Sequence, residues 1–315
     1  MFPAGMRRRW WLFRIVDLIA RHWPVLTKRT GLLIVRMDGI GDMVLFRQAL
    51  DSYSSIFSIP NSDILVLGCK SWAEIASEVF NGYRLLIIDE HSYARQPFYR
   101  LKIGLMVRRL NVETTICDSY FRRAMMADSL VWVSAAEKTI VSLPFINEPT
   151  RAEFTYYLSQ VDRIIDTGPY PTHEIIRHYN FLSSITQSRV LPKVPVVPWN
   201  EQSTLAPTSP YIVINPGSNE HGRRWPFENY LNIAEALCTK GYKVVIVGSR
   251  GERAGDHRER FGNDKRVIDL AGKTQLPDLM SVLKHADATI SNDTGPAHLS
   301  IALGTPTVVI VGGGH

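Results

Sequence analysis

The stretch SNDTGPAHLSIALGTP, residues 291–306, decides the fold, because it joins two apolar runs of strand length, 288–290 and 307–311, through a polar turn. Pro296 follows the turn at a position where a helix tolerates proline, since the first N–H groups of a helix have no partner inside it. The stretch therefore predicts a strand, a turn, a helix and a second strand, the repeating unit of an α/β fold.

The polar turn of this stretch indicates the chemistry. Thr294 or Asp293 is placed to cap the following helix, and Gly295 allows a ligand to approach the backbone closely. Free N–H groups and the helix dipole attract an anion to such a helix start. The Asp293 carboxylate does not suit a bare phosphate, but it can accept hydrogen bonds from sugar hydroxyls. The turn therefore predicts recognition of a sugar phosphate.

The rest of the chain repeats this alternation from Gly31 onward. In the first half we expect strands at 32–35, 64–67, 85–88 and 114–117, helices at about 42–54, 71–80 and 97–109, and mainly helical structure to about Ser188. In the second half we expect strands at 211–215, 244–248, 267–270, 288–290 and 307–311, with helices at about 227–239, 276–285 and 296–303. Strands that alternate with helices predict right-handed crossovers and parallel sheets.

A proline-rich stretch divides the two halves. Residues 191–210 contain five prolines and few helix formers, which is typical of a linker. We therefore expect an extension at 1–30 and two doubly wound, Rossmann-like α/β domains at 31–190 and 211–315. The ligand cleft is expected between the domains, at the carboxyl ends of the strands. Because 312–315 is a glycine-rich end directly after a strand, the second domain looks cut short.

The net charge of +6 comes entirely from the N-terminal extension. Residues 1–30 hold seven basic side chains and one acidic one, which leaves 29 of each in the remainder of the 315-residue chain. A nucleic-acid-binding body would carry a basic face of its own, so we expect no nucleic-acid partner. The composition, 45% hydrophobic and 21% charged, is ordinary for a globular protein, and three well-separated cysteines favour a reducing compartment.

The extension itself predicts an amphipathic helix. One face carries Arg7, Arg14, Asp17 and Arg21, and the other carries Leu12, Val16, Ile19 and Trp23. Arginine and tryptophan around an apolar stripe suit a helix that lies on an anionic membrane surface through residues 7–23. The alternative is a helix that packs on the protein's own body with its arginines in solvent. No stretch approaches the ~20 apolar residues of a membrane-spanning helix.

A second glycine-containing turn follows the first expected strand, at residues 36–42. Gly39 and Gly41 resemble the start of a dinucleotide fingerprint, which would favour a nicotinamide-dependent oxidoreductase, but Val44 stands in the third glycine's place. Asp42 also opposes a pyrophosphate there, because it competes for the same N–H donors. Two interpretations of the acids remain: Asp38 and Asp42 stabilise the helix start, or Asp42 is a general base in the cleft.

Two further loops follow strands of the second half. In the first, Arg223 and Arg224 stand near Gly217 and Ser218, and guanidinium and backbone N–H groups together can clamp a diphosphate. The alternative for this loop is a solvated basic surface. In the second, Glu252 can accept hydrogen bonds from ribose hydroxyls or can simply favour a helix start.

Metal and cofactor signals are weak in this chain. His173 and His178 are five residues apart, which turns about 140° on a helix and cannot present both rings to one metal. The sequence has no Asp-x-Asp pair for a metal–nucleotide complex. His298 either orients a phosphate or packs. We therefore expect no metal and no cofactor.

Five motifs lie in order along residues 31–315: Arg36-Met37-Asp38-Gly39-Ile40-Gly41-Asp42, Pro216-Gly217-Ser218 with Arg223-Arg224-Trp225-Pro226, Gly248 with Glu252, Leu270-Ala271-Gly272-Lys273-Thr274, and Asn292 to His298 with Ala302 to Pro306. Together they resemble glycosyltransferase family 9, the ADP-heptose:lipopolysaccharide heptosyltransferases. The resemblance implies a GT-B fold, with an acceptor-binding domain at 31–190 and a donor-binding domain at 211–315. It also implies a reaction that inverts the anomeric centre without an essential metal.

The resemblance also implies roles for individual residues. Asp42 is implied as the general base, and Arg36 and Asp38 as acceptor-binding residues. The implied donor-binding residues are Ser218, Arg223, Arg224, Glu252, Asp293, Thr294, Gly295 and His298. Arg223 stands where many members carry a lysine, which keeps the charge and changes the geometry.

The function expected from this resemblance is transfer of a sugar from a nucleoside diphosphate, with ADP-heptose as the leading donor. The expected acceptor is a lipopolysaccharide core or another cell-surface glycolipid, and the expected workplace is the cytoplasmic face of the membrane. The alternative is a non-catalytic or truncated protein that binds sugar nucleotides and associates with the membrane.

Overall fold

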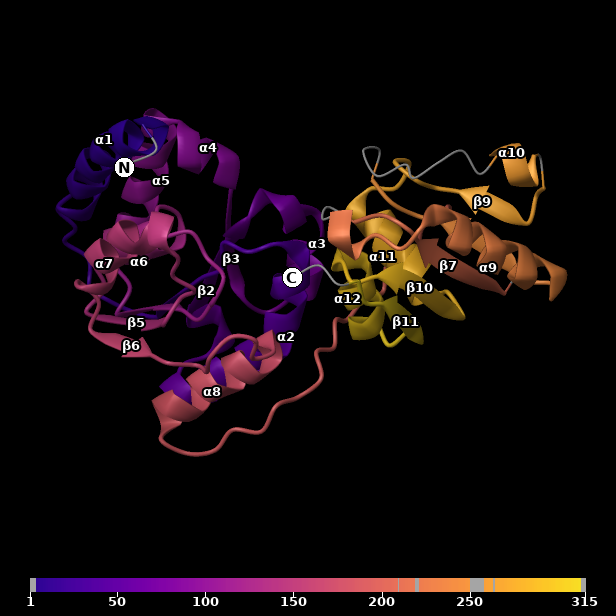
Figure 1. The fold of residues 1–315 in the computed structure, drawn as a ribbon. Coiled ribbons are helices and arrows are strands. Elements are labelled where there is room, and N and C mark those ends of the chain that lie inside the picture. Colours follow the sequence, from indigo (N-terminus) through magenta and orange to yellow (C-terminus); the bar gives the residue numbers. More distant parts are fainter. Residues whose placement is uncertain (1–3, 209, 219–220, 250–257, 263, 313–315) are drawn as a thin grey trace. The chain divides into compact units, whose positions relative to one another are not determined.

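The chain forms two compact units, Met1–Lys193 and Val194–His315, in a computed structural model (Figure 1). The structure describes residues 4–208, 210–218, 221–249, 258–262 and 264–312, with side chains from Leu12 onward. The boundary between the units falls inside the proline-rich stretch that the sequence predicts as a linker.

The N-terminal unit is built on one parallel sheet of six strands in the order β3-β2-β1-β4-β5-β6. The strands are β1 (Leu32–Val35), β2 (Ile64–Cys69), β3 (Arg84–Ile88), β4 (Thr114–Cys117), β5 (Lys138–Ser142) and β6 (Arg163–Ile165). Every residue of β1, β2 and β4 is buried, as expected for central strands that helices cover on both faces. The expected parallel sheet is confirmed.

The α-helices of this unit precede, connect and follow these strands. They are α1 (Ala4–Arg21), α2 (Ile40–Phe57), α3 (Ala73–Val79), α4 (Glu90–Arg95), α5 (Pro97–Leu110), α6 (Ala127–Ser134), α7 (Arg151–Leu158) and α8 (Glu174–Thr186). Between residues 118 and 188 the helices α6, α7 and α8 dominate, as expected, but the strands β5 and β6 also lie there and were not expected. β6 has three residues, two of them exposed, so its sequence shows neither an apolar run nor an alternation.

The C-terminal unit contains a parallel sheet of five strands in the order β11-β10-β7-β8-β9. Its strands are β7 (Tyr211–Asn215), β8 (Lys243–Ile246), β9 (Val267–Asp269), β10 (Ala288–Asn292) and β11 (Thr307–Ile310), and its helices are α9 (Phe227–Thr239), α10 (Arg258–Phe261), α11 (Leu276–Lys284) and α12 (Gly295–Ala302). The second part of the proline-rich stretch packs on this unit. Val197 N–H donates to Ala302 O at 2.9 Å, and Trp199 Nε1 donates to Ser281 Oγ at 2.9 Å.

Helix α1 packs on the N-terminal unit through its charged face, which neither interpretation of the sequence anticipates. Asp17 is 1% exposed and forms a bidentate ion pair with the buried Arg100 of α5, with N–O distances of 2.6 and 2.7 Å. Ser129 and Tyr157 donate to the same carboxylate at 3.0 and 3.3 Å. Gly104 of α5 allows the close approach, because a Cβ there would meet the Ala20 Cβ at 2.8 Å.

No helix in the described part of the chain is both long and apolar enough to cross a bilayer.

Candidate active site

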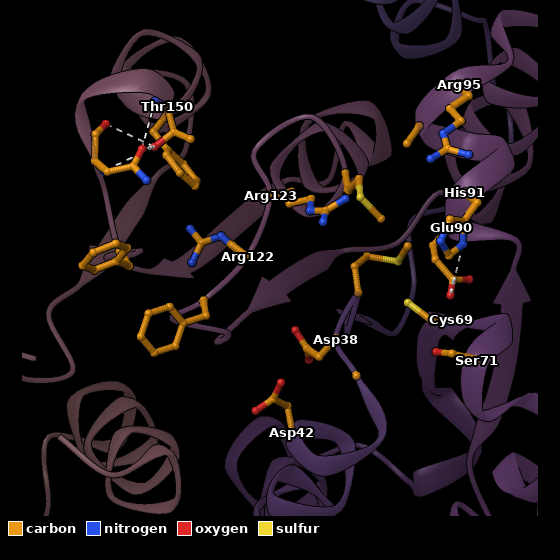
Figure 2. A pocket seen from close by; sticks show the side chains of 18 residues that line it. Asp38, Asp42, Cys69, Ser71, Glu90, His91, Arg95, Arg122, Arg123 and Thr150 are labelled. Atoms are coloured by element: carbon orange, nitrogen blue, oxygen red, sulfur yellow. Dashed lines mark hydrogen bonds and ion pairs between the residues drawn. The ribbon is translucent and has the colours of Figure 1, made fainter. Parts of the chain in front are cut away.

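A cavity of about 480 Å³ opens in the N-terminal unit at the carboxyl ends of β1 to β4 (Figure 2). Each strand leads into a wall of it, as expected for a parallel α/β sheet, where ligands bind at this edge. The lining includes Asp38, Gly39 and Asp42 after β1, Cys69 at the end of β2 with Ser71 beyond it, Glu90, His91 and Arg95 after β3, and Phe121, Arg122 and Arg123 after β4.

Asp42 lies in the first turn of α2, and its carboxylate faces the cavity (Figure 2). The side chain is exposed, so a solute in the cavity can reach it. The N-cap of α2 is Gly39, and no side chain caps the helix. The alternative in which Asp38 caps α2 is therefore wrong, and Asp42 remains available for chemistry.

Arg36 is buried, which corrects its expected role as an acceptor ligand. Its side chain is 1% exposed and forms ion pairs with Asp38 at 2.7 Å and with Asp118 at 2.6 Å. A third contact, 3.4 Å from Nη2 to Asp42 O, ties the guanidinium to the start of α2. Arg36 therefore positions the β1–α2 turn and does not contact the cavity directly.

Asp118, at the end of β4, is a member of this buried network that the sequence analysis missed. Its carboxylate accepts from Arg36, from His178 Nδ1 at 2.8 Å and from Tyr53 at 3.4 Å. Burial raises the pKa of Asp118, but Arg36 and His178 more than offset that effect, so the carboxyl stays well below its usual range. An ionised Asp118 holds Arg36 in place beneath the cavity.

Asp38 lies between Arg36 and the cavity. Burial raises its pKa to about 6, against the lowering effect of Arg36 and with a further rise from Asp42. The Asp38 carboxyl therefore titrates close to neutral pH.

Between pH 4 and pH 7 the wild type is expected to lose about 2 kcal/mol of unfolding free energy relative to Asp38→Asn. The folded-state pKa of about 6 exceeds the ordinary value of 3.8, so the folded state binds the proton more tightly. This stabilisation is complete below pH 4 and is lost as the pH rises through 6. Urea unfolding of both proteins across that range measures it, and parallel pH dependences would contradict the assignment to Asp38.

The wall that follows β3 and β4 is basic and aromatic. Arg95 and Arg123 line the cavity with exposed side chains, and Phe121 and Phe145 stand 5.4 Å apart between ring centroids. Arg122 also lines it, but its guanidinium is committed to Asp128 in a bidentate pair at 2.9 Å. The sequence analysis missed this wall, although Arg122 and Arg123, like Arg223 and Arg224, form a basic pair in a loop that follows a strand.

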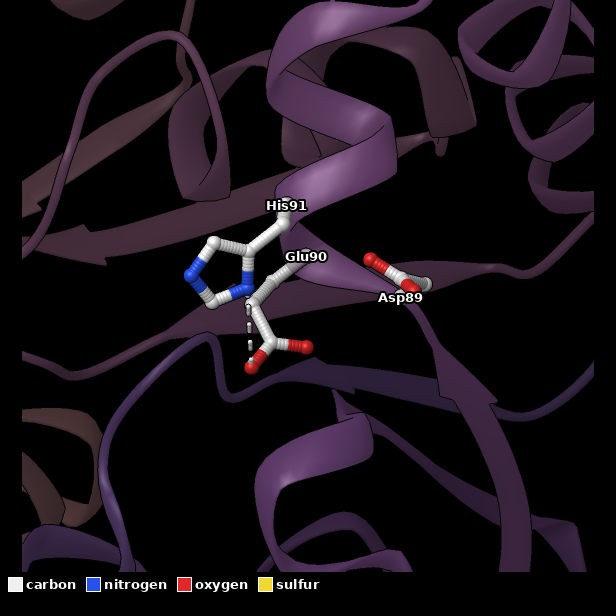
Figure 3. Close-up of side chains that lie close together, drawn as sticks. All are labelled: Asp89, Glu90 and His91. Carbon is white, nitrogen blue, oxygen red and sulfur yellow. Dashed lines mark ion pairs between the residues drawn. The ribbon is translucent and has the colours of Figure 1, made fainter. Parts of the chain in front are cut away.

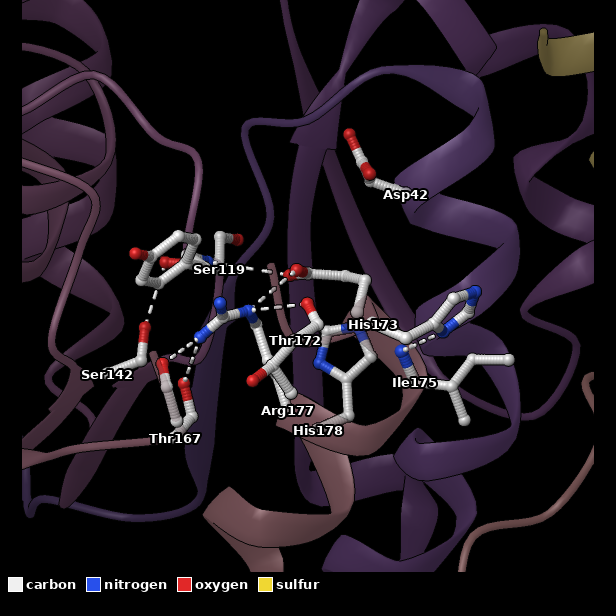
Figure 4. Close-up of polar contacts among 12 residues, drawn as sticks. Asp42, Ser119, Ser142, Thr167, Thr172, His173, Ile175, Arg177 and His178 are labelled. Atoms are coloured by element: carbon white, nitrogen blue, oxygen red, sulfur yellow. Dashed lines mark hydrogen bonds and ion pairs between the residues drawn. The ribbon is translucent and has the colours of Figure 1, made fainter. Parts of the chain in front are cut away.

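The loop before α8 is held by Arg177, which is buried (Figure 4). Its guanidinium donates to the carbonyls of Gly168, Pro169 and Thr172 at 2.5 to 3.1 Å and lies 3.5 Å over the Tyr120 ring. His173 accepts from Ile175 N–H at the start of α8, so this histidine and His178 have separate partners. Asp42 stands apart from these contacts (Figure 4).

Asp89, Glu90 and His91 bring three possible metal ligands within 4.8 Å of one another (Figure 3). Asp89 accepts from Ser92 N–H at 2.8 Å as the cap of α4, and Glu90 accepts from Lys70 N–H at 3.0 Å. The Lys70 ammonium, 3.5 Å from Asp89, already places a cation beside the group. These contacts account for the cluster as a helix cap.

In the C-terminal unit, Asn292 joins the two loops that the sequence predicts as the donor site. Its side-chain Oδ1 accepts from Trp225 N–H at 3.1 Å and from the Tyr230 hydroxyl at 2.8 Å, and its Nδ2 donates to Pro216 O at 2.8 Å. The residue is completely buried at the end of β10. Asn292 is therefore structural, and it holds the loop after β7 beside the loop after β10.

Arg223, Asp293 and His298 come together at this junction. Asp293 lies 3.9 Å from Arg223 Nη1 and 3.6 Å from His298 Nε2, and all three side chains are partly exposed. A cation, a carboxylate and an imidazole around one opening can hold a diphosphate together with sugar hydroxyls.

The remaining donor residues take different places. Thr294 is the N-cap of α12, but its side chain does not cap it; Thr294 Oγ1 accepts from Asn215 at 3.0 Å. Gly295 is the first residue of α12 and directly follows Asp293 and Thr294. Ser218 is buried, and its carbonyl accepts from Arg224 Nε at 2.7 Å, so Arg224 folds back onto its own loop. Glu252 lies outside the described residues.

Gly312, after β11, packs against the Arg223 loop. A Cβ at Gly312 would stand 2.5 Å from Gly222 O and 2.9 Å from Arg223 Cα, and backbone atoms cannot move aside cheaply. Gly312→Ala is therefore expected to cost about 1–3 kcal/mol of unfolding free energy and to weaken nucleotide binding, because the loop must shift. Urea unfolding and calorimetric titration with ADP test this, and unchanged values for both would contradict it.

Comparison with known proteins finds similarity to heptosyltransferases. A family model described as glycosyltransferase family 9 (heptosyltransferase) matches residues 186–313. The lipooligosaccharide heptosyltransferase 2 of Haemophilus influenzae is 30% identical over 144 residues, 44% of this chain and 40% of that protein. The lipopolysaccharide heptosyltransferase 2 of Escherichia coli K12 is 33% identical over 117 residues, 35% of this chain and 33% of that protein. The matched part thus spans less than half of these relatives.

Solved structures match most of the fold. A glycosyl transferase family 9 structure from Veillonella parvula has a TM-score of 0.73 at 18% identity and covers 89% of this chain and 80% of that one. The E. coli heptosyltransferase WaaC with ADP-2-deoxy-2-fluoro heptose has a TM-score of 0.66 at 18% identity and covers 89% of this chain and 88% of that one. The expected GT-B type of fold, with two Rossmann-like sheets, is confirmed.

Proposed function

Since the chain belongs to glycosyltransferase family 9, we propose that it is an inverting, metal-independent glycosyltransferase that uses a nucleoside diphosphate sugar. The leading donor is ADP-heptose, and the acceptor is a lipopolysaccharide core or a related glycolipid. The observation that carries the proposal is the Asp42 carboxylate, which faces a cavity at the carboxyl edge of the first sheet.

On the acceptor side, Asp42 acts as the general base. It takes the proton of an acceptor hydroxyl while that oxygen forms a bond to the anomeric carbon of the donor sugar. Arg36 and Asp118 act through the backbone, because they hold the turn that carries Asp42. Asp38, which titrates near pH 6, sets the charge beside this base.

On the donor side, the bond from the anomeric carbon to the diphosphate oxygen breaks, and the nucleoside diphosphate leaves with the electron pair. Arg223 stabilises the charge that develops on the leaving group, helped by backbone N–H groups around Thr294 to Ala297. Asp293 accepts hydrogen bonds from sugar hydroxyls. Ser218, Arg224, Gly295 and His298 complete the donor site, and Glu252 is assigned the ribose. The WaaC structure with an ADP-heptose analogue supports ADP-heptose as the first donor to test.

The acceptor is proposed to be anionic. Arg95 and Arg123 present two cations to the cavity, and Phe121 and Phe145 give it apolar surface on which a sugar ring can stack. Such an acceptor is a phosphorylated or acidic glycolipid, and the transfer reaction would therefore take place at the cytoplasmic face of the membrane. Residues 7–23 are proposed as the membrane contact.

Release of nucleoside diphosphate from ADP-, UDP- and GDP-sugars, with and without a bacterial glycolipid acceptor, tests the proposal. We expect acceptor-dependent release from ADP-heptose. Release from another donor would support the glycosyltransferase activity and would show that the donor is not ADP-heptose. Binding of nucleotide without turnover of any donor would favour a non-catalytic sugar-nucleotide-binding protein.

A further inference from the structure

Helix α1 turns its apolar stripe away from the protein. With Asp17, Phe13 and Ala20 packed inward, the outward positions are Leu12, Ile15, Leu18 and Ile19, which are 48 to 58% exposed. Trp23, after the helix, is 41% exposed and Leu26 is completely exposed. Apolar side chains are more stable in an apolar environment than in water. Their exposure therefore leaves an uncovered apolar surface on the unit.

The orientation of α1 is enforced by its inner face. The bidentate Asp17–Arg100 pair is buried, and Arg14 and Arg21 lie over the aromatic rings of Tyr156 and Trp132, at 3.8 and 5.0 Å. Turning the apolar stripe inward would break the buried pair and leave an uncompensated charge, which costs several kcal/mol. The apolar face is therefore a fixed outer surface of the unit.

Helix α5 packs beside α1 (Figure 1). It also exposes a stripe of side chains. Its exposed side chains are Phe98, Lys102, Met106 and Arg109, at helical spacing. Neither helix has an exposed acid among its described residues, because Asp17 is the only acid in α1 and α5 has none. We call the exposed side chains of these two neighbouring helices the α1–α5 face; they are Leu12, Ile15, Leu18, Ile19, Phe98, Lys102, Met106 and Arg109. It combines apolar side chains with positive charge.

We propose that the α1–α5 face docks on an anionic lipid bilayer. Apolar residues interleaved with Lys and Arg fit the interface of a bilayer, where the stripe enters the acyl boundary and the cations meet lipid phosphates. A second copy of the chain fits less well, since a symmetric contact would bring Lys102 and Arg109 against the same charges. The basic residues of 1–30, opposed only by the internally paired Asp17, add to the attraction.

The inner side of α1 is connected to the cavity wall through Arg100. Arg100, which holds Asp17, also donates to Met125 O at 2.9 Å, and Met126 lines the cavity. A unit that is docked through the α1–α5 face keeps its acceptor cavity near the lipid surface. Docking itself requires neither donor nor acceptor, so it can be tested apart from the transferase chemistry.

The test is cosedimentation of the full chain with vesicles of phosphatidylcholine alone or with phosphatidylglycerol added. We expect binding to the anionic vesicles that weakens with salt. The variant Leu12→Gln/Ile15→Gln/Ile19→Gln is expected to bind about tenfold or more weakly. Lys102→Gln/Arg109→Gln is expected to lose about fivefold for each charge, on anionic vesicles only.

A matched control replaces three apolar residues that are exposed elsewhere, Ile176, Leu191 and Ile301 at 40, 62 and 43%, with glutamine. It is expected to bind vesicles like the wild type. Circular dichroism shows whether each variant is folded. Wild-type levels of binding by the folded α1 variant, or no binding by the wild type, would overturn the proposal. So would a dimer in solution that the α1 variant dissociates in the absence of vesicle binding.

Discussion

Asp42→Asn is expected to lower acceptor-dependent turnover by about 10²–10⁴-fold, the range that a positioned general base contributes. Asparagine keeps the size of the side chain and cannot take the hydroxyl proton. The affinity for the nucleotide is expected to stay unchanged, because the donor residues belong to the other unit. Initial rates of ADP release at saturating donor, with calorimetric titration by ADP beside them, measure both quantities.

Asp51→Asn is the matched control for this variant. Asp51 is an acid of the same helix, α2, but its carboxylate pairs with Arg47 at 2.6 Å and does not line the cavity. The control is expected to turn over donor like the wild type. If Asp42→Asn kept full acceptor-dependent activity while the protein remained folded, Asp42 could not be the base.

The central strands of both units were predictable because their chemistry is local. β1, β4 and β7 are short runs between polar turns and are apolar or β-branched except for Asn215 at the end of β7, and helices cover both faces of such strands. β6 was not predictable, since a three-residue edge strand with exposed side chains depends on its neighbour β5 for hydrogen bonds. Pairing between distant segments leaves no periodicity in the segment itself.

The candidate site was predictable only where a polar turn follows a strand. Asp42, Asp293 and the Arg223 loop stand at such turns, and the structure places each at the carboxyl edge of a sheet. Arg36 stands there too, but its burial against Asp118 depends on β4, some eighty positions away in the sequence. Asp118 itself looks like any acid after a strand until Arg36, His178 and Tyr53 are known to surround it.

Helix α1 shows a further limit of periodicity. The helical pattern separates a charged face from an apolar face correctly, and it suggests that the apolar face is the one to bury. The neighbouring helix α5 determines which face is buried instead. Its Arg100 is buried and requires a negatively charged partner, which is Asp17 on the charged face of α1. Amphipathicity thus identifies the two faces of a helix, whereas the charge of the neighbouring surface decides which face turns inward.

Arg223→Gln is expected to lower kcat for donor turnover by about 10²–10³-fold, the effect of removing one preorganised group at a developing charge. Glutamine keeps much of the reach of the side chain and some hydrogen bonding but loses the positive charge opposite the leaving diphosphate. Because that charge grows as the sugar–oxygen bond breaks, kcat should fall more than the affinity for intact donor. Steady-state kinetics with ADP-heptose and a glycolipid acceptor separate the two effects.

Arg260→Gln is the matched control, since Arg260 is an arginine of the same unit with a similar exposed fraction, 30% against 27%, and pairs with Glu228 and Glu235. Arg223→Lys distinguishes charge from geometry. If charge alone matters, lysine restores most of the lost rate. If the bidentate guanidinium matters, lysine restores affinity without the rate. Equal kcat for Arg223→Gln and the wild type would remove Arg223 from the reaction and leave the backbone N–H groups at the start of α12 to stabilise the leaving group.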